Sequence, residues 1–182
     1  MVGEHYQDSL IQHIVRWIVE IATVIALAWV CVYAFGTQTV NAGQSMRTTL
    51  EDGDRLLLDR VTPKLFGPGR FDVVLFQSPS GSAVSIKRIV GLPGEAVQIQ
   101  HGALLINGEP LQLPEGLDAA VSIAGEAEEP VLLGEDEYFV LSDNREAGED
   151  SRFGSVGSVP IEAITGRVWF RIAPLGKIGL IK

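Results

Sequence analysis

The chain has 182 residues, of which 46% are hydrophobic, and a formal net charge of −9. This length suits one compact domain with an anchor and is too short for two ordinary domains with a linker. Lys and Arg form no cluster, so a nucleic acid is not expected as a partner, because phosphate binding needs concentrated positive charge. A single cysteine, Cys31, excludes an internal disulfide and a multi-cysteine metal site.

The apolar run from Ile14 to Phe35 predicts a transmembrane helix. At about 1.5 Å per residue it spans roughly the 30 Å of a hydrocarbon core. Trp17 and Tyr33 fall near its two ends, where interfacial aromatics are common. A cleavable signal peptide is the alternative interpretation, with Val32-Tyr33-Ala34 as the cleavage site, but the segment before the run is poor in basic residues.

The anchor divides the chain into three parts. We expect a short cytoplasmic N-terminus at 1–13, the anchor at 14–35, and an extracytoplasmic β catalytic domain at 36–182. Arg16 is the basic residue on the N-terminal side, and the positive-inside rule then favours a cytoplasmic N-terminus.

After Gly36 the sequence predicts short strands separated by turns. The apolar runs are bounded by Gly, Pro and Asn, and no segment holds a helical period over three turns. The expected strands are 55–59, 71–76, 95–100, 103–106, 138–141 and 166–171. The stretch 111–134 is irregular and acidic, which indicates a small insertion. The predicted fold class is therefore mainly β, compact and rich in antiparallel pairing, with one N-terminal transmembrane helix.

Ser45 is the first candidate for chemistry, in the tetrapeptide Gly-Gln-Ser-Met. Arg47 stands where the elbow of α/β-hydrolases needs a second Gly. A triad partner is also missing, because His5 and His13 precede the anchor and His101 occupies a turn on the expected surface. A Ser–His–Asp arrangement is thus excluded by the residues present.

A lysine can replace the histidine as general base. Its usual pKa of about 10.4 falls when burial disfavours the ammonium. Lys87 follows Ile86 on an apolar run that predicts a strand, and Arg88 is expected to be the outward-facing charge. The alternative interpretation is an exposed strand lysine. Ser–Lys chemistry needs no metal and no cofactor, so we expect neither.

A third informative segment, residues 142–152, alternates acidic and basic side chains; we call it the charged loop. Carboxylates and guanidiniums in this pattern indicate bidentate pairs that lock a backbone, whereas the alternative is a solvated polar loop. The residues concerned are Asp143, Arg145, Asp150 and Arg152.

Together these segments resemble bacterial type I signal peptidases (leader peptidases of family S26), membrane-anchored Ser–Lys endopeptidases that remove signal peptides from exported proteins. Four blocks match in the same order over nearly the whole chain. They are 43–50, 53–58 with 71–76, 87–95, and 143–152. The C-terminal segment 166–179 is also similar to that family.

The resemblance implies a signal-peptidase/repressor-type β fold and a role for each site residue. Ser45 would be the nucleophile, Lys87 the general base, and Ser151 the hydroxyl that orients the lysine amine. The backbone N–H of Ser45 would be one oxyanion donor, and Gly43 stands where some members carry a serine as the second donor. Supporting residues would be Met46, Asp143, Arg145, Asp150 and Arg152, and Ile86 would line the substrate pocket.

The resemblance also implies partners and a location: signal peptides of preproteins, cut after Ala-x-Ala, and the lipid bilayer of the inner or plasma membrane. Three residues depart from the family pattern: Thr48 replaces a Pro, Ser142 a Gly, and Gly148 a Ser or Asn. Three alternatives stay open. They are a specialised Ser–Lys maturation peptidase, a self-cleaving regulator of the repressor type, and a catalytically silent peptide-binding module.

Overall fold

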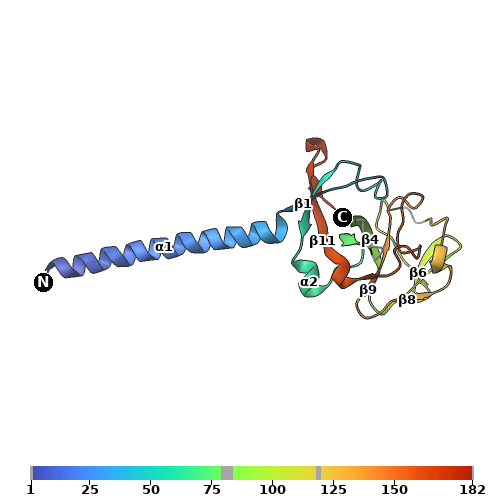
Figure 1. Ribbon diagram of the computed structural model, residues 1–182, viewed down its shortest axis with the longest axis horizontal. Helices are drawn as coiled ribbons and strands as arrows, with labels where there is room; N and C mark the ends of the chain where they lie inside the picture. The colour runs from blue at the N-terminus through green and yellow to red at the C-terminus, as the bar shows by residue number, and fades with distance from the viewer. Residues whose placement is uncertain (1, 79–83, 118–119, 182) are drawn as a thin grey trace.

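The computed structural model describes residues 2–78, 84–117 and 120–181, with side chains from residue 11 onward. A single helix, α1 (Val2–Phe35), projects from a β domain that contains the rest of the chain (Figure 1). Its segment Ile11–Phe35 has a mean hydropathy of 2.2 and is almost entirely exposed. By length and composition this segment can cross a membrane, a test that a signal sequence also passes. The predicted apolar helix is confirmed, and it continues further toward the N-terminus than the apolar run alone indicated.

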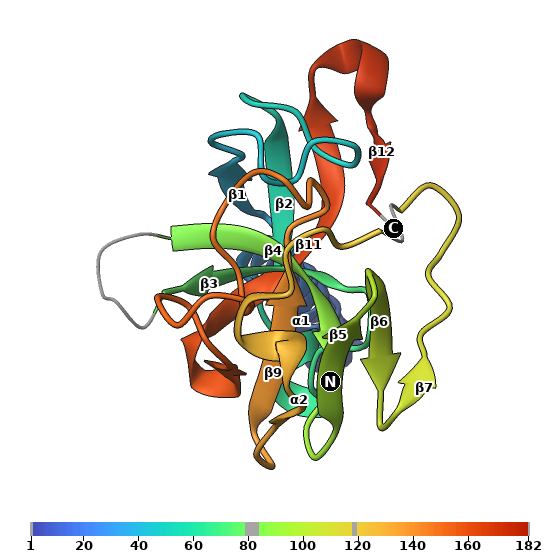
Figure 2. The ribbon, with the colours of Figure 1, turned by 90° about the vertical axis from the view of Figure 1, so that its right-hand side faces the viewer.

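Two antiparallel sheets form the β domain, which confirms the predicted fold class. The larger sheet has the order β1-β2-β11-β3-β4-β9-β10, with β12 paired to β11, and the smaller has the order β7-β6-β5-β8 (Figure 2). The larger sheet contains β1 (Thr37–Val40), β2 (Arg55–Asp59), β3 (Val73–Gln77), β4 (Val84–Gly91), β9 (Glu137–Leu141), β10 (Val159–Pro160), β11 (Ile164–Ala173) and β12 (Gly179–Leu180). The smaller contains β5 (Ala96–Gln100), β6 (Ala103–Ile106), β7 (Glu109–Pro110) and β8 (Val131–Leu132).

Short helices connect the strands. They are α2 (Thr62–Phe66), η1 (Gly125–Glu128), η2 (Ile161–Ala163) and η3 (Leu175–Lys177). The stretch 111–134, of which 118–119 lie outside the described residues, is more ordered than its composition indicated. It contains η1 and β8, and β8 pairs with β5. Buried Ala127 and Leu133 hold it against the core of the smaller sheet, a tertiary contact that a local pattern does not reveal.

The central strands β3 and β4 are covered on both faces. In β3, four successive residues from Val73 are buried, and in β4 every residue from Ile86 to Gly91 is buried. Alternation of polar and apolar residues is therefore lost there, as in any strand enclosed on both sides. The prediction that Arg88 faces outward is wrong for this reason: its side chain is only 1% exposed.

Gly91 lets the end of β4 approach the smaller sheet closely. A Cβ at this position would lie 2.5 Å from Val97 Cγ2, 2.8 Å from Phe139 Cβ and 2.9 Å from Leu133 Cδ1. All three neighbours belong to the buried cluster under the smaller sheet. The absence of a side chain at Gly91 thus sets the distance between the two sheets.

We expect Gly91→Ala to lower the free energy of unfolding by about 1–3 kcal/mol, because the extra methyl overpacks a filled core. Chemical denaturation of the detergent-solubilised chain measures the change. Gly176→Ala is the matched control, since an added Cβ there meets nothing within 4 Å. Equal stability of the two variants would contradict the close approach.

Candidate active site

Ser45 lies in the nucleophile loop, which we define as residues 41–54 between β1 and β2. The side chains of Met46 and Leu50 are completely buried in the core beneath β2 and β3 and anchor the loop, while Ser45 itself stays half-buried. A tight turn is closed by Leu50 N–H, which donates to Met46 O at 2.7 Å. Gly43 begins the turn with φ +94°, a value that favours glycine. Its N–H donates to Asp52 Oδ1 at 2.8 Å.

Lys87 reaches the same place from β4. Its residue is only 4% exposed, although it carries an amine. A Cβ added at Gly148 would lie 2.7 Å from Ser45 Cβ and 3.1 Å from Lys87 Nζ. The hydroxyl-bearing carbon and the amine therefore face one small space, which is kept open because residue 148 has no side chain.

Burial lowers the pKa of the Lys87 amine, since desolvation disfavours the ammonium form. The charges of Asp150, Asp143 and Glu149 oppose this effect, and the charge of Arg152 adds to it. Because the net direction is downward, a neutral amine, the form that accepts a proton, is more abundant than for an exposed lysine.

Asp143 and Arg88 form a buried ion pair directly behind the site. Arg88 Nε donates to Asp143 Oδ1 and Nη2 to Oδ2, both at 2.8 Å. Thr49 Oγ1, from the nucleophile loop, donates to Asp143 Oδ2 at 2.6 Å. One bidentate pair with a hydroxyl thus ties β4, the nucleophile loop and the charged loop together.

A second ion pair shapes the charged loop internally. Arg152 Nε donates to Asp150 Oδ1 at 2.8 Å and Nη2 to Oδ2 at 3.0 Å. Arg152 Nη2 also donates to the carbonyl of Arg145 at 2.9 Å, and Asp150 Oδ2 accepts the N–H of Ser142 at 2.9 Å. One bidentate pair, Arg152 with Asp150, thus lies within the loop, whereas Asp143 pairs with Arg88 from β4. All four charged side chains of the predicted set are buried rather than solvated.

Ser151, the residue expected to orient the lysine, is 2% exposed and lies in the same loop. Its Oγ accepts the N–H of Val140, on β9, at 2.9 Å. In the described part of the chain no hydrogen bond joins Ser151 Oγ to Lys87 Nζ. The assignment of Ser151 as the orienting hydroxyl stays a prediction.

Two cavities meet at Ser45 and Lys87. One, of about 130 Å³, runs between residues 39–42 and 84–87 and has Leu75 and Ile86 in its wall. The other, of about 320 Å³, lies toward Gly148 and Glu149. Ile86, expected in a substrate pocket, thus lines a cavity that the nucleophile also lines.

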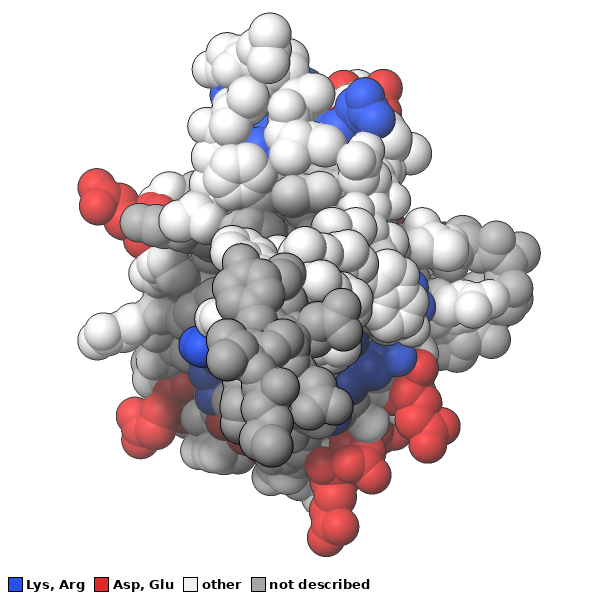
Figure 3. All heavy atoms as spheres, turned by 90° about the vertical axis from the view of Figure 1, so that its left-hand side faces the viewer, with Lys and Arg blue, Asp and Glu red and all other residues white. Residues whose placement is uncertain are grey.

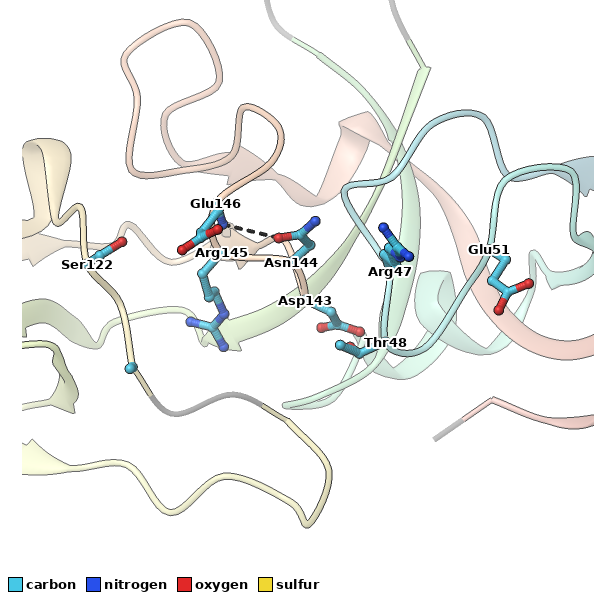
Figure 4. Close-up of a pocket in the computed structure, with 9 residues that line it drawn as sticks. Arg47, Thr48, Glu51, Ser122, Asp143, Asn144, Arg145 and Glu146 are labelled. Carbon is cyan, nitrogen blue, oxygen red and sulfur yellow. Dashed lines mark hydrogen bonds between the residues drawn. The ribbon is translucent and has the colours of Figure 1, made fainter.

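A larger cavity, of about 630 Å³, lies beside the site but contains neither Ser45 nor Lys87. Figure 4 shows it between Arg47 and Glu51 of the nucleophile loop on one side and Arg145 and Glu146 of the charged loop on the other. Its charged walls do not suit the small apolar side chains expected of a substrate, so we place the site at the two smaller cavities.

Among the described residues no group of His, Cys, Asp and Glu is arranged to hold a metal ion. His101 is exposed in a turn, at φ +52°, as the sequence indicated. Ser45 and Lys87 thus bring together a hydroxyl and a desolvated amine, and His101 lines neither of the two cavities that they share.

The family model and the sequence relatives indicate the same family. The sequence model of the family described as "Signal peptidase, peptidase S26" matches residues 14–173. A signal peptidase I of Leptolyngbya laminosa is 36% identical over 149 residues, which cover 75% of this chain and 68% of that protein. A probable signal peptidase I-2 of Synechocystis is 34% identical over 75% of this chain and 63% of that protein, so the match spans less than two thirds of its length. A crystal structure of a signal peptidase I from Enterococcus faecalis is 30% identical, covers 56% of this chain and 96% of that chain, and has a TM-score of 0.45.

Removing one partner of the buried Arg88–Asp143 pair should destabilise the domain strongly. We expect Arg88→Met to lower the free energy of unfolding by about 3–5 kcal/mol, because Asp143 would stay buried without its counter-charge. Denaturant unfolding in detergent measures this loss.

Arg55→Met is the control. Arg55 is an exposed arginine on β2 whose Nη2 donates to Gln38 Oε1 at 2.9 Å, so its loss leaves no buried carboxylate unpaired in the described part of the chain. A loss of about 0.5 kcal/mol or less is expected there. If both variants lost the same small amount, the buried pair would not be what holds the site together.

Proposed function

This chain belongs to the signal peptidase S26 family of membrane-anchored serine endopeptidases that remove signal peptides, and we propose that it acts with Ser45 as nucleophile and Lys87 as general base. One observation carries the proposal: the side chains of both residues face the same space beside Gly148, with a lysine amine whose pKa is lowered by burial. A desolvated lysine next to a serine is a recurrent way to activate a hydroxyl.

The reaction is acyl transfer in two stages. The neutral Lys87 amine takes the proton of Ser45 Oγ as this oxygen attacks the scissile carbonyl, which gives a tetrahedral oxyanion and an ammonium. The ammonium then returns its proton to the leaving amine, and an acyl ester remains on Ser45. Water, deprotonated by the same amine, hydrolyses the ester and regenerates the free serine.

The backbone N–H of Ser45 is the oxyanion donor that we assign. In the described part of the chain it makes no hydrogen bond, so it is available to a developing negative charge. The N–H of Gly43 is engaged by Asp52. Gly43 therefore does not offer a second donor unless that hydrogen bond opens, and the glycine carries no hydroxyl that could act instead.

The substrate segment fits as an added strand. β4 pairs with β3 from Val84 to Arg88 but with β9 only from Arg88 onward, which leaves the other edge of residues 84–87 without a partner among the described strands. β1 is an edge strand of the same sheet, and the 130 Å³ cavity lies between these two edges. An extended peptide can bind there by main-chain hydrogen bonds, and the small volume favours the Ala-x-Ala type of cleavage site.

The lipid bilayer is the second partner. About ten residues separate the end of α1 from Ser45, a reach of roughly 30 Å at most when extended. Figure 3, viewed from the side of α1, shows Lys and Arg atoms beside the helix and carboxylates farther out, toward the periphery of that face. Such a face suits a position against the membrane, where a signal peptide delivers its cleavage site. We propose a plasma-membrane protein with a cytoplasmic segment 1–13, an anchor at 14–35 and an extracytoplasmic catalytic domain at 36–182.

Ser45→Ala and Lys87→Met should each abolish processing, because one removes the nucleophile and the other removes the base while keeping the apolar stem. The measurement is incubation of the detergent-solubilised full chain with a preprotein that carries an Ala-x-Ala site, followed by sequencing of the new N-terminus. Lys64→Met, which changes an exposed lysine on α2, is the matched control and should leave the rate unchanged. Residual activity above a few per cent in Lys87→Met would mean that another group deprotonates Ser45.

The pH dependence should report the buried amine. Since only neutral Lys87 accepts the proton, kcat/KM rises with pH as the ammonium is lost. Burial lowers the pKa of Lys87, so this rise should occur well below the usual value of about 10.4. Initial rates on a peptide substrate without titrating side chains measure it. A rise centred near 10.4 would show that the amine is solvated during catalysis.

A further inference from the structure

Ser142 carries a buried hydroxyl that the mechanism above does not use. The residue follows β9 directly and is 0% exposed. In the part of the chain that the structure describes, its Oγ has no hydrogen-bond partner. A buried hydroxyl without a partner is costly, because it gives up its bonds to water and gains none in return. We therefore expect Ser142 Oγ to form a hydrogen bond in the working enzyme.

The strand register directs Ser142 to the catalytic lysine. In the antiparallel ladder of β4 and β9, Ile89 pairs with Val140 and Arg88 with Leu141. The ladder ends at Arg88 and Leu141, and if its register is continued by one step, Lys87 falls opposite Ser142. Residues directly opposite in an antiparallel pair point to the same face, with Cβ atoms about 4.5–5.5 Å apart.

Gly148 gives a second, independent measure of the same proximity. The Cβ position built on Gly148 lies 3.1 Å from Lys87 Nζ, 3.4 Å from Ser142 Oγ and 2.7 Å from Ser45 Cβ. The amine and the hydroxyl thus border the same small space, and rotation of the lysine side chain would bring them together. The backbone of Gly148, at φ +101°, is in a region that disfavours any side chain, so the space stays open.

The other polar groups near Lys87 already have partners. The carboxylate of Asp150 accepts from Arg152 and from the N–H of Ser142, and that of Asp143 accepts from Arg88 and Thr49. Ser151 Oγ accepts from Val140. Ser142 Oγ differs from these buried groups because, in the described part of the chain, both of its lone pairs are free to accept a hydrogen bond.

We propose that Ser142 is the positioning residue of the general base: its Oγ accepts an N–H from the Lys87 amine and turns the nitrogen lone pair toward Ser45. An amine on a flexible stem rotates freely, so a single fixed N–H bond decides where its lone pair points. The inference rests on the proposed Ser45–Lys87 mechanism. It assigns to Ser142, a departure from the family pattern, the orienting role that the sequence analysis gave to Ser151.

Ser142→Ala tests the proposal in the full-length, detergent-solubilised protein. We expect kcat to fall roughly tenfold to a hundredfold through misorientation of the base, with KM nearly unchanged because the buried hydroxyl does not reach the peptide. The rise of kcat/KM with pH should also move to lower pH, because the lost oxygen stabilised the ammonium more than the amine. The neighbouring charges of Asp143, Glu149, Asp150 and Arg152 are unchanged in this variant.

Ser158→Ala is the matched control, because it removes a serine hydroxyl from a residue that lines neither of the two cavities at the site. Thermal unfolding checks that each variant is folded. A Ser142→Ala enzyme with wild-type kcat and pH profile would overturn the proposal. So would Ser151→Ala if that variant, and not Ser142→Ala, displaced the pH profile. Activity retained by Ser45→Ala would instead refute the underlying mechanism, so the two failures are distinguishable.

Discussion

The withdrawal of one lysine amine from water is the constraint on which this active site depends. Lys87 lies on β4, a strand covered on both faces, so its amine cannot keep a full hydration shell. Burial raises the free energy of an ammonium because it loses hydration. The lowered pKa of Lys87 shows that this penalty favours the neutral form of the amine. In the mechanism that we propose, this neutral amine is the form that accepts the proton of Ser45.

The neighbour of Lys87 shows why enclosure does not remove every charge from the strand. Arg88 points to the opposite face of β4. There its guanidinium donates two hydrogen bonds to the carboxylate of Asp143, which accepts a further one from Thr49 Oγ1. Two consecutive residues of one strand thus have opposite electrostatic surroundings. The guanidinium of Arg88 is paired with a carboxylate, whereas the amine of Lys87 has no carboxylate in contact in the described part of the chain. The same pair links the nucleophile loop to the charged loop through Thr49, and next to it Asn144 N–H donates to the carbonyl of Ser45 at 2.9 Å.

The sequence predicted the elements better than it predicted which side chains they bury. Apolar runs bounded by Gly and Pro identified β2 to β6, β9 and β11, but not the shorter β1, β7, β8, β10 and β12. Ser45, Lys87 and the alternating charges lie in the segments that the structure brings together at the candidate site. Arg88 was misplaced because a central strand covered on both faces loses the alternation on which such a judgement depends. The short strand β8 was missed because it is defined by its pairing with β5 and by the burial of Leu133. Both are long-range contacts that leave no local pattern.

Ser142 illustrates a limit of assigning roles by motif position. In the sequence, Ser142 and Gly148 are two unrelated departures from a family pattern, six positions apart. In the structure they border one space beside Lys87 Nζ, so the hydroxyl gained at one position and the side chain absent at the other have to be considered together. A hydroxyl directly after β9 would approach the amine across the ladder, whereas one at residue 148 would approach it from the loop. An orienting hydrogen bond to the amine needs a suitable distance and angle, and a hydroxyl at residue 142 or at residue 148 can provide both.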